Sequence, residues 1–113
     1  MRYIALMRWT VETLDIVDAE IEALPPALQA RLLRLMEMVE RVGLEQLREP
    51  HVKHVEGKIW ELRAKATEGI ARGLYVTMAG RRVVILHVFI KKSRKTPRNA
   101  LDIARERMKQ VTP

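Results

Sequence analysis

The sequence contains no cysteine, a single serine and few aromatic residues, and each shortage excludes a kind of chemistry. Without cysteine there can be no disulfide, no thiolate metal ligand and no thiol nucleophile. Ser93 is the only serine, and no Ser/His/Asp arrangement is recognisable around it. Aromatic residues make up only 4% of the chain, so binding of single-stranded nucleic acid through base stacking is weakly supported.

Signatures of metal sites, phosphate loops and membrane spans are also missing. The three histidines, His51, His54 and His87, lie in two places without metal-ligand spacing, and the five glycines are dispersed. No run of about eighteen apolar residues occurs, so we expect no membrane span. Residues 1–9 lack the small-residue cleavage site of a signal peptide. A cytoplasmic protein that needs no cofactor and no metal is the default expectation.

Positive charge is abundant and unevenly distributed. The chain carries 21 Lys+Arg and 14 Asp+Glu, a formal net charge of +7. Residues 1–50 hold 6 basic and 9 acidic residues, a net −3, whereas residues 51–113 hold 15 and 5, a net +10. The basic half predicts a polyanionic partner, most simply nucleic acid. The acidic half would be a poor surface for RNA, and we expect it to face elsewhere.

Two helices and a strand are predicted for the N-terminal half. The segment 3–12 is expected to form a strand, and its apolar period then changes to that of a helix from Leu14 to Leu24, with Thr13 as the N-cap. Pro25-Pro26 ends this helix and opens a second one, which Gly43 terminates. The short link between the helices predicts a helix hairpin.

The C-terminal half is predicted to be mainly β. Residues 44–58 read as an irregular connector. Three strands, at 59–65, 70–78 and 83–90, should form an antiparallel meander, and a helix over 97–110 closes the chain. The whole chain, 1–113, is therefore predicted to be one α+β domain, in which the N-terminal strand and helix hairpin pack on a small antiparallel sheet.

The stretch 83–98 (VVILHVFIKKSRKTPR) contains the strongest functional signal. Its apolar first half suits a central strand, and five cations follow at once: Lys91, Lys92, Arg94, Lys95 and Arg98. Thr96-Pro97 has the form of an N-cap followed by proline at the first helical position. A strand that delivers cations to one point can position a phosphate. The alternative is a solubilising basic loop after a core strand.

Arginine and lysine at the strand ends suit one metal-free reaction, the cleavage of RNA by its own 2′-hydroxyl. Arg63, Arg72, Lys91 and Lys92 come from strands or strand ends of the meander and could converge on one face. Arginine offers fixed N–H donors to phosphate oxygens, and a lysine crowded by cations could act as an acid or base. Glu61 could be a base, although an ion-pair partner of Arg63 or Lys65 is the commoner role.

Three further side chains allow a structural reading. His87 could be catalytic, but a histidine within an apolar strand is more often a hydrogen-bonded core residue. Alternation along residues 59–65 places Trp60 and Leu62 on one face, and we expect both in the core.

Several motifs occur in an order that resembles a known toxin family. They are P-x-V-K-x-V-x-G at 50–57, W-E-L-R at 60–63, Arg72 shortly before Tyr75, F-x-K-K at 89–92, K-T-P at 95–97 and A-x-x-R at 104–107. Together they resemble the RelE/HigB-like toxins of bacterial toxin–antitoxin systems, most closely the phage-derived HigB-type branch. With the preceding helix pair, the resemblance covers nearly the whole chain.

The resemblance implies a RelE-like α+β toxin that is a ribosome-dependent mRNA endoribonuclease (mRNA interferase) and inhibits translation without metal or cofactor. It implies that Arg63 and Arg72 hold the scissile phosphate and that Lys91 and Lys92 bind phosphate and transfer protons. Further contacts to RNA are expected from Lys65, Arg94, Lys95 and Arg98. The implied partners are mRNA, the ribosome and a cognate antitoxin of the helix-turn-helix type.

The sequence departs from the RelE branch in one respect, because no tyrosine follows Tyr75 where that branch has a catalytic tyrosine near its C-terminus. The residue that transfers the proton therefore stays open. Two other functions also stay open. One is a non-catalytic RNA- or ribosome-binding module, and the other is an inactive toxin relic that acts through antitoxin binding.

Overall fold

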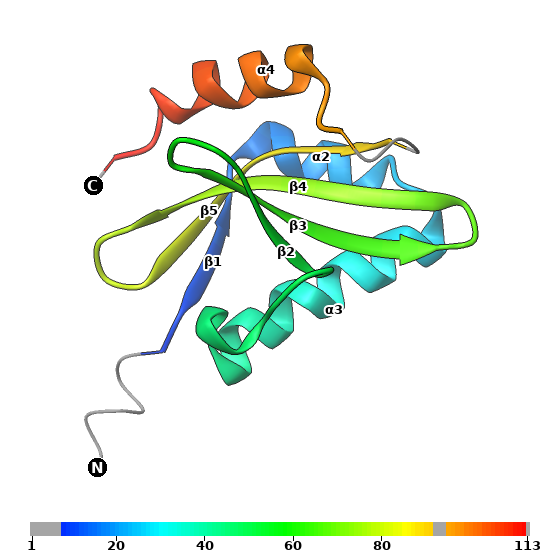
Figure 1. Cartoon of the computed structure of the whole chain (residues 1–113), viewed down its shortest axis with the longest axis horizontal. Coiled ribbons are helices and arrows are strands. Elements are labelled where there is room, and N and C mark those ends of the chain that lie inside the picture. Colours follow the sequence, from blue (N-terminus) through cyan, green and yellow to red (C-terminus); the bar gives the residue numbers. More distant parts are fainter. Residues whose placement is uncertain (1–7, 92–94, 113) are drawn as a thin grey trace.

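A mixed five-stranded sheet forms the centre of the computed structural model, which describes residues 8–91 and 95–112. The strands are β1 (Thr10–Thr13), β2 (Val52–Glu56), β3 (Ile59–Ala66), β4 (Gly69–Met78) and β5 (Arg82–Ile90), in the order β1-β5-β4-β3-β2 (Figure 1). The strands β2 to β5 form an antiparallel meander, and β1 pairs with β5 in parallel.

Helices cover both faces of this sheet. The helices are α2 (Asp15–Glu22), α3 (Pro26–Val42) and α4 (Arg98–Met108), with a 3₁₀ turn, η1 (Leu44–Gln46), after α3. In Figure 1, α3 and α4 lie on opposite sides of the sheet. Pro26 occupies the first turn of α3, and Gly43 ends the helix with φ of 97°, a conformation that favours glycine.

The two helix–sheet contacts differ in strength. Four residues of α3, Leu28, Leu32, Leu35 and Val39, are buried at helical spacing against the sheet. Each buried aliphatic side chain contributes about 1.5–3 kcal/mol. The helix α4 buries only Ala100, Leu101 and Ala104, against a second cluster that includes Leu74 and Val84. The face that carries α4 is therefore the less firmly covered one.

The α+β class, the meander, the second helix and the C-terminal helix are confirmed. The sequence prediction missed β2, which lies inside the expected connector 44–58, and it did not foresee the parallel pairing of β1. Of the predicted strand 3–12, residues 8 and 9 do not belong to a strand and β1 begins at Thr10, while residues 3–7 lie outside the described residues.

Both predicted N-caps are wrong. The N-cap of α2 is Leu14, and the hydroxyl of Thr13 donates instead to Asp18 Oδ1 over 2.5 Å. The N-cap of α4 is Pro97, and the Thr96 hydroxyl donates to a carboxylate of β3. In each case the threonine hydroxyl donates to a carboxylate, and neither helix has a side-chain hydrogen bond at its N-cap.

The prediction for Trp60 is also wrong, whereas Leu62 is buried as expected. Trp60 is 39% exposed and lines an open groove with Trp9 and Tyr75, and it contacts the ring of His54 edge-on at 5.0 Å. Alternation correctly placed Trp60 and Leu62 on the same face, but it could not show where along β3 the cover of that face ends.

Candidate nucleic-acid site

Two arginines lie opposite each other in the middle of the sheet. Arg63 of β3 and Arg72 of β4 are register partners, so their side chains share one face of the sheet. Glu61 precedes Arg63 by two residues and lies on that same face. The three side chains thus form a compact charged cluster, and the predicted convergence of Arg63 and Arg72 is observed.

Glu61 lies between the two guanidinium groups. Its Oε1 is 3.2 Å from Arg63 Nε and 3.6 Å from Arg72 Nη1, and its Oε2 accepts a hydrogen bond of 3.1 Å from the Thr96 hydroxyl. Glu61 and Arg72 are 1% and 0% exposed. Burial lowers the pKa of Arg72, the charge of Glu61 raises it, and the neighbouring Arg63 lowers it. The ion-pair role considered for Glu61 is therefore the one observed.

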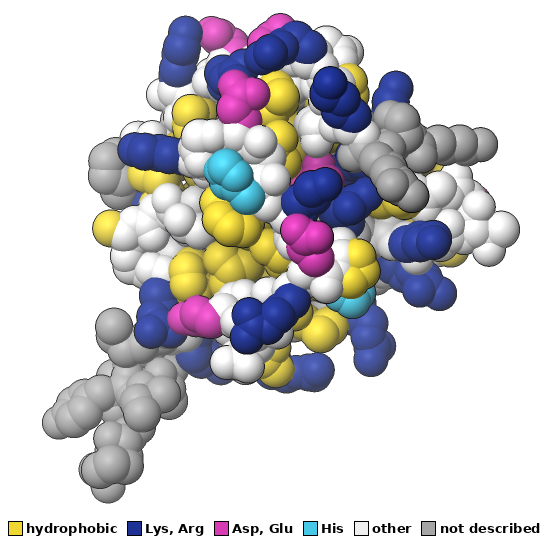
Figure 2. Space-filling model, in the orientation of Figure 1, with side chains coloured by type: hydrophobic (Ala, Val, Ile, Leu, Met, Phe, Trp, Pro, Cys, Tyr) yellow, Lys and Arg dark blue, Asp and Glu magenta, His cyan; other side chains and the backbone are white. Residues whose placement is uncertain are grey.

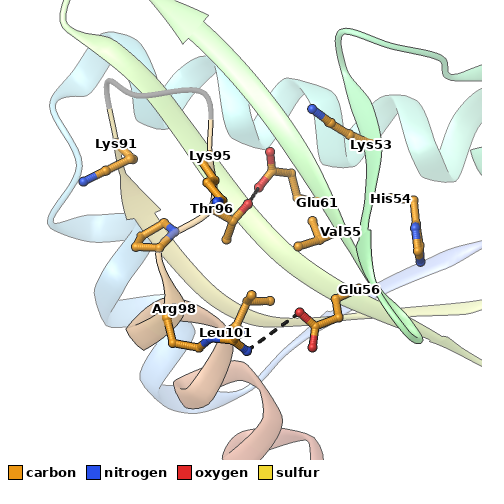
Figure 3. A pocket seen from close by; sticks show the side chains of 11 residues that line it. Lys53, His54, Val55, Glu56, Glu61, Lys91, Lys95, Thr96, Arg98 and Leu101 are labelled. Atoms are coloured by element: carbon orange, nitrogen blue, oxygen red, sulfur yellow. Dashed lines mark hydrogen bonds and ion pairs between the residues drawn. The ribbon is translucent and has the colours of Figure 1, made fainter.

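A cavity of about 620 Å³ opens beside this cluster. Figure 3 shows its lining converge from four parts of the chain: β2, β3, the end of β5 and the start of α4. Four of the lining side chains are cations, Lys53, Lys91, Lys95 and Arg98. Only two are carboxylates, and one of these, Glu61, already pairs with both arginines. The cavity is consequently suited to an anionic ligand.

The second carboxylate of this cavity joins β2 to α4. Glu56 pairs with Arg105, and its Oε1 also lies 3.9 Å from Arg98 Nη1. Arg98 is largely exposed, so its charge remains accessible at the mouth of the cavity.

The predicted site residues divide into four groups. Lys91, Lys95 and Arg98 line the first cavity, while Lys65 lines a second cavity that also includes Arg63. Lys92 and Arg94 lie outside the described residues. Arg72 belongs to the cluster around Glu61, but it is fully buried and lines neither cavity.

Lys53 and Thr96 are among the residues of the site that were not predicted. Lys53 is the register partner of Glu61 across β2 and β3, and it lines the cavity. Its place in the P-x-V-K motif was the only signal, because β2 was not predicted. Thr96 was assigned to helix capping, whereas it fixes the buried carboxylate.

A second charged cluster lies at the edge of β5. His87 Nδ1 is 3.0 Å from Glu20 Oε2, and Arg107 donates to the same oxygen over 2.8 Å. Burial lowers the pKa of His87, an effect that Glu20 opposes and the charge of Arg107 reinforces. The hydrogen bonding predicted for His87 is confirmed, but the residue is only partly buried and does not belong to the core as expected. His87 is not among the residues that line the first cavity.

Metal ligation has no support among residues 8–91 and 95–112, where no group of three or more His, Asp or Glu side chains could hold a metal ion. Within the same residues, no helix is both long and apolar enough to cross a membrane.

The arrangement of the sheet and helices is that of the RelE fold. A structure of a mutant of the E. coli toxin RelE in the free state matches with a TM-score of 0.61 and 10% sequence identity. The match covers 93% of this chain and 99% of that one. A search of curated proteins found no match.

The family follows from the sequence match. Residues 19–109 match the family model described as phage derived protein Gp49-like, so the chain belongs to the Gp49-like family, a RelE-type toxin family. The RelE-type resemblance of the motifs is thereby confirmed, while the assignment to a HigB-type branch stays a prediction.

Proposed function

We propose that this protein is a toxin of a toxin–antitoxin system and acts as a ribosome-dependent mRNA endoribonuclease in the cytoplasm. The observation that carries the proposal is the pair of sheet arginines fixed by Glu61 beside a cavity lined by four cations. Family membership and the RelE fold support the toxin class.

The reaction needs a rigid donor for a doubly charged phosphorane. In this reaction the 2′-hydroxyl loses its proton and its oxygen attacks the phosphorus. The bond from phosphorus to the 5′-oxygen breaks, and the 5′-oxygen takes up a proton. Arg63 is the better placed donor, because its side chain is 16% exposed whereas that of Arg72 is fully buried. A preorganised donor of this kind typically contributes about 2.7–4 kcal/mol to a charged transition state.

Arg72 then acts behind Arg63. Together with Glu61 it forms a buried ion-pair cluster that holds the Arg63 guanidinium in one orientation. No reorganisation of the donor is then needed when charge develops on the phosphate. We assign phosphate binding and proton transfer to Lys91 and Lys92, the F-x-K-K lysines, and neutralisation of the flanking backbone to Lys95 and Arg98. Lys53 extends the same cationic wall from β2.

The proposal also names partners. The basic cavity suits an acidic segment of a cognate antitoxin, since complementary potentials favour association, and such a segment would block mRNA from the same cations.

The test is induced expression without antitoxin, followed by growth and by mapping of mRNA 5′ ends. The wild type should arrest growth and produce new internal mRNA ends. Arg63→Ala should lose both, with cleavage reduced about 10²–10³-fold. Lys109→Ala removes an equally positive, exposed side chain outside the cavity and should behave as the wild type.

Two other outcomes separate the alternatives. Growth arrest without new mRNA ends would identify a binding module that blocks ribosomes without cleaving. No arrest by folded wild-type protein would refute the nuclease and leave a relic that acts through its antitoxin.

A further inference from the structure

A second cavity, of about 480 Å³, has an entirely basic set of charges. It is lined by Arg31 and Arg34 of α3, Arg63 and Lys65 of β3, and His51 just before β2. The remaining lining residues are apolar, and no carboxylate is among them. This contrasts with the first cavity, which contains Glu56 and Glu61.

Of the four Lys and Arg side chains in this cavity, Arg63 is paired with Glu61, whereas the other three carry charges that no carboxylate of the described residues offsets. In the stretches 8–91 and 95–112, no ion pair involves Arg31, Arg34 or Lys65. These three side chains are exposed. Several like charges held together without a counter-ion repel one another, and a bound anion would relieve this repulsion.

The position of α3 was not foreseen from the sequence. The −3 half of the chain was expected to face away from a nucleic-acid surface, yet α3 brings two of its arginines beside Lys65 and Arg63. Figure 2 shows Lys and Arg side chains gathered on the side of the molecule where the β3–β4 turn lies and below it toward α3. The basic surface therefore extends beyond the +10 half.

The two cavities meet at one ion pair. Arg63 lines the second cavity, and its Nε lies 3.2 Å from Glu61, which lines the first. The Arg63–Glu61 pair thus lies between them, with Glu61 lining the first cavity and Arg63 the second. A strand whose phosphate contacts Arg63 can continue from one cavity into the other.

We propose that the second cavity binds the sugar–phosphate backbone of the RNA strand on one side of the scissile phosphate. The inference rests on the proposed function, because it takes the first cavity to hold the reacting phosphate. Guanidinium and ammonium groups recognise phosphate oxygens, and no Phe, Tyr or Trp lines the cavity to stack on a base. Recognition at this cavity is therefore of the backbone and independent of sequence.

The test measures the salt dependence of binding to an uncleavable, 2′-O-methylated single-stranded RNA of about ten nucleotides, within the usual range of site sizes. The variant is Arg31→Ala/Arg34→Ala. Arg41→Ala/Lys109→Ala serves as the control, because it removes the same charge from exposed positions outside both cavities. Loss of two phosphate contacts should reduce the slope of log K against log salt by about 1.4.

This difference is large enough to measure. Between about 50 and 200 mM salt, wild-type affinity should fall roughly sevenfold more than that of the variant, and the control should follow the wild type. Equal slopes for the variant and the control would overturn the proposal. Lys65→Gln, which removes a charge from β3 instead of α3, provides a second measurement and should reduce the slope by about 0.7.

Because the RNA cannot be cleaved, this result does not depend on catalysis. If the wild type shows no nuclease activity, the slopes still decide whether RNA binds here. If it is active, Arg31→Ala/Arg34→Ala should raise KM for long RNA and leave kcat unchanged. A lower kcat with unchanged KM would contradict a role in binding the strand.

Discussion

Glu61→Gln is the substitution that tests the buried cluster most directly. It keeps the shape of the side chain and an oxygen that can accept the Thr96 hydrogen bond, but it removes the negative charge between Arg63 and Arg72. Arg72 is 0% exposed, so its guanidinium cannot reach solvent unless the sheet rearranges. The variant therefore removes the carboxylate that pairs with this buried cation.

The expected cost follows from this burial. Removing one partner of a buried ion pair costs about 3–5 kcal/mol. For a domain of this size, about 4 °C of Tm accompanies each kcal/mol, so Tm should fall by roughly 12–20 °C. Glu68→Gln is the matched control, since Glu68 lies exposed in the β3–β4 turn and should change the free energy of unfolding by less than about 0.5 kcal/mol.

Denaturant unfolding followed by circular dichroism measures both variants. The double variant Glu61→Leu/Arg72→Met removes both charges, and it should recover most of the stability lost in Glu61→Gln. A Glu61→Gln protein as stable as Glu68→Gln would refute the reasoning, because Arg72 would then not need the carboxylate. Cleavage by Glu61→Gln should also fall, mainly through kcat, since Arg63 is no longer held in one orientation.

Three further predictions concern charges away from the cavity. Arg107→Met should lower the free energy of unfolding by about 1.5–3 kcal/mol, because Arg107 donates to Glu20 and so joins α4 to α2; denaturant unfolding would show no change if this contact were incidental. Burial lowers the pKa of His87 below its ordinary 6.5, so the unfolded chain takes up this proton first. Stability should consequently fall as pH drops through 6.5, and thermal unfolding of His87→Gln across this range should show a flatter profile. The pKa of Glu12 is lowered mainly by its hydrogen bond from Arg82, so this pair adds stability at neutral pH that is lost as pH falls below 4.5. Since Glu12 is 42% exposed, Glu12→Gln should cost less than about 1 kcal/mol at pH 7 and nothing in acid, as measured by urea unfolding at both pH values.

Local signals explain what could be predicted of the fold. The bounds of α3 follow from Pro26 at its start and Gly43 at its end, and its buried stripe follows from the helical period of its leucines. Of the four meander strands, β3, β4 and β5 follow from alternation, an apolar run and turn residues. Each of these signals acts over a few residues, so it can be recognised without knowledge of how the rest of the chain folds.

The candidate site was predicted only in part, for a physical reason. Alternation shows that Glu61, Arg63 and Lys65 share a face, but not that Glu61 is buried while Lys65 is exposed. The burial depends on Arg72 across the strand pair and on Thr96, 35 residues away in the chain. Lys53 was missed because β2 has a short, mixed pattern that becomes a strand only by pairing with β3.

By itself, the sequence determined the α+β class, the basic half, the strand arginines and the RelE-type family, because periodicity, charge and motifs are written along the chain. Only the tertiary structure decided the parallel pairing of β1, the burial of Glu61 between two arginines and the approach of α3 to β3. These three features are contacts between distant segments. They are set by sheet register and by which face each helix covers, and neither quantity can be read from local spacing.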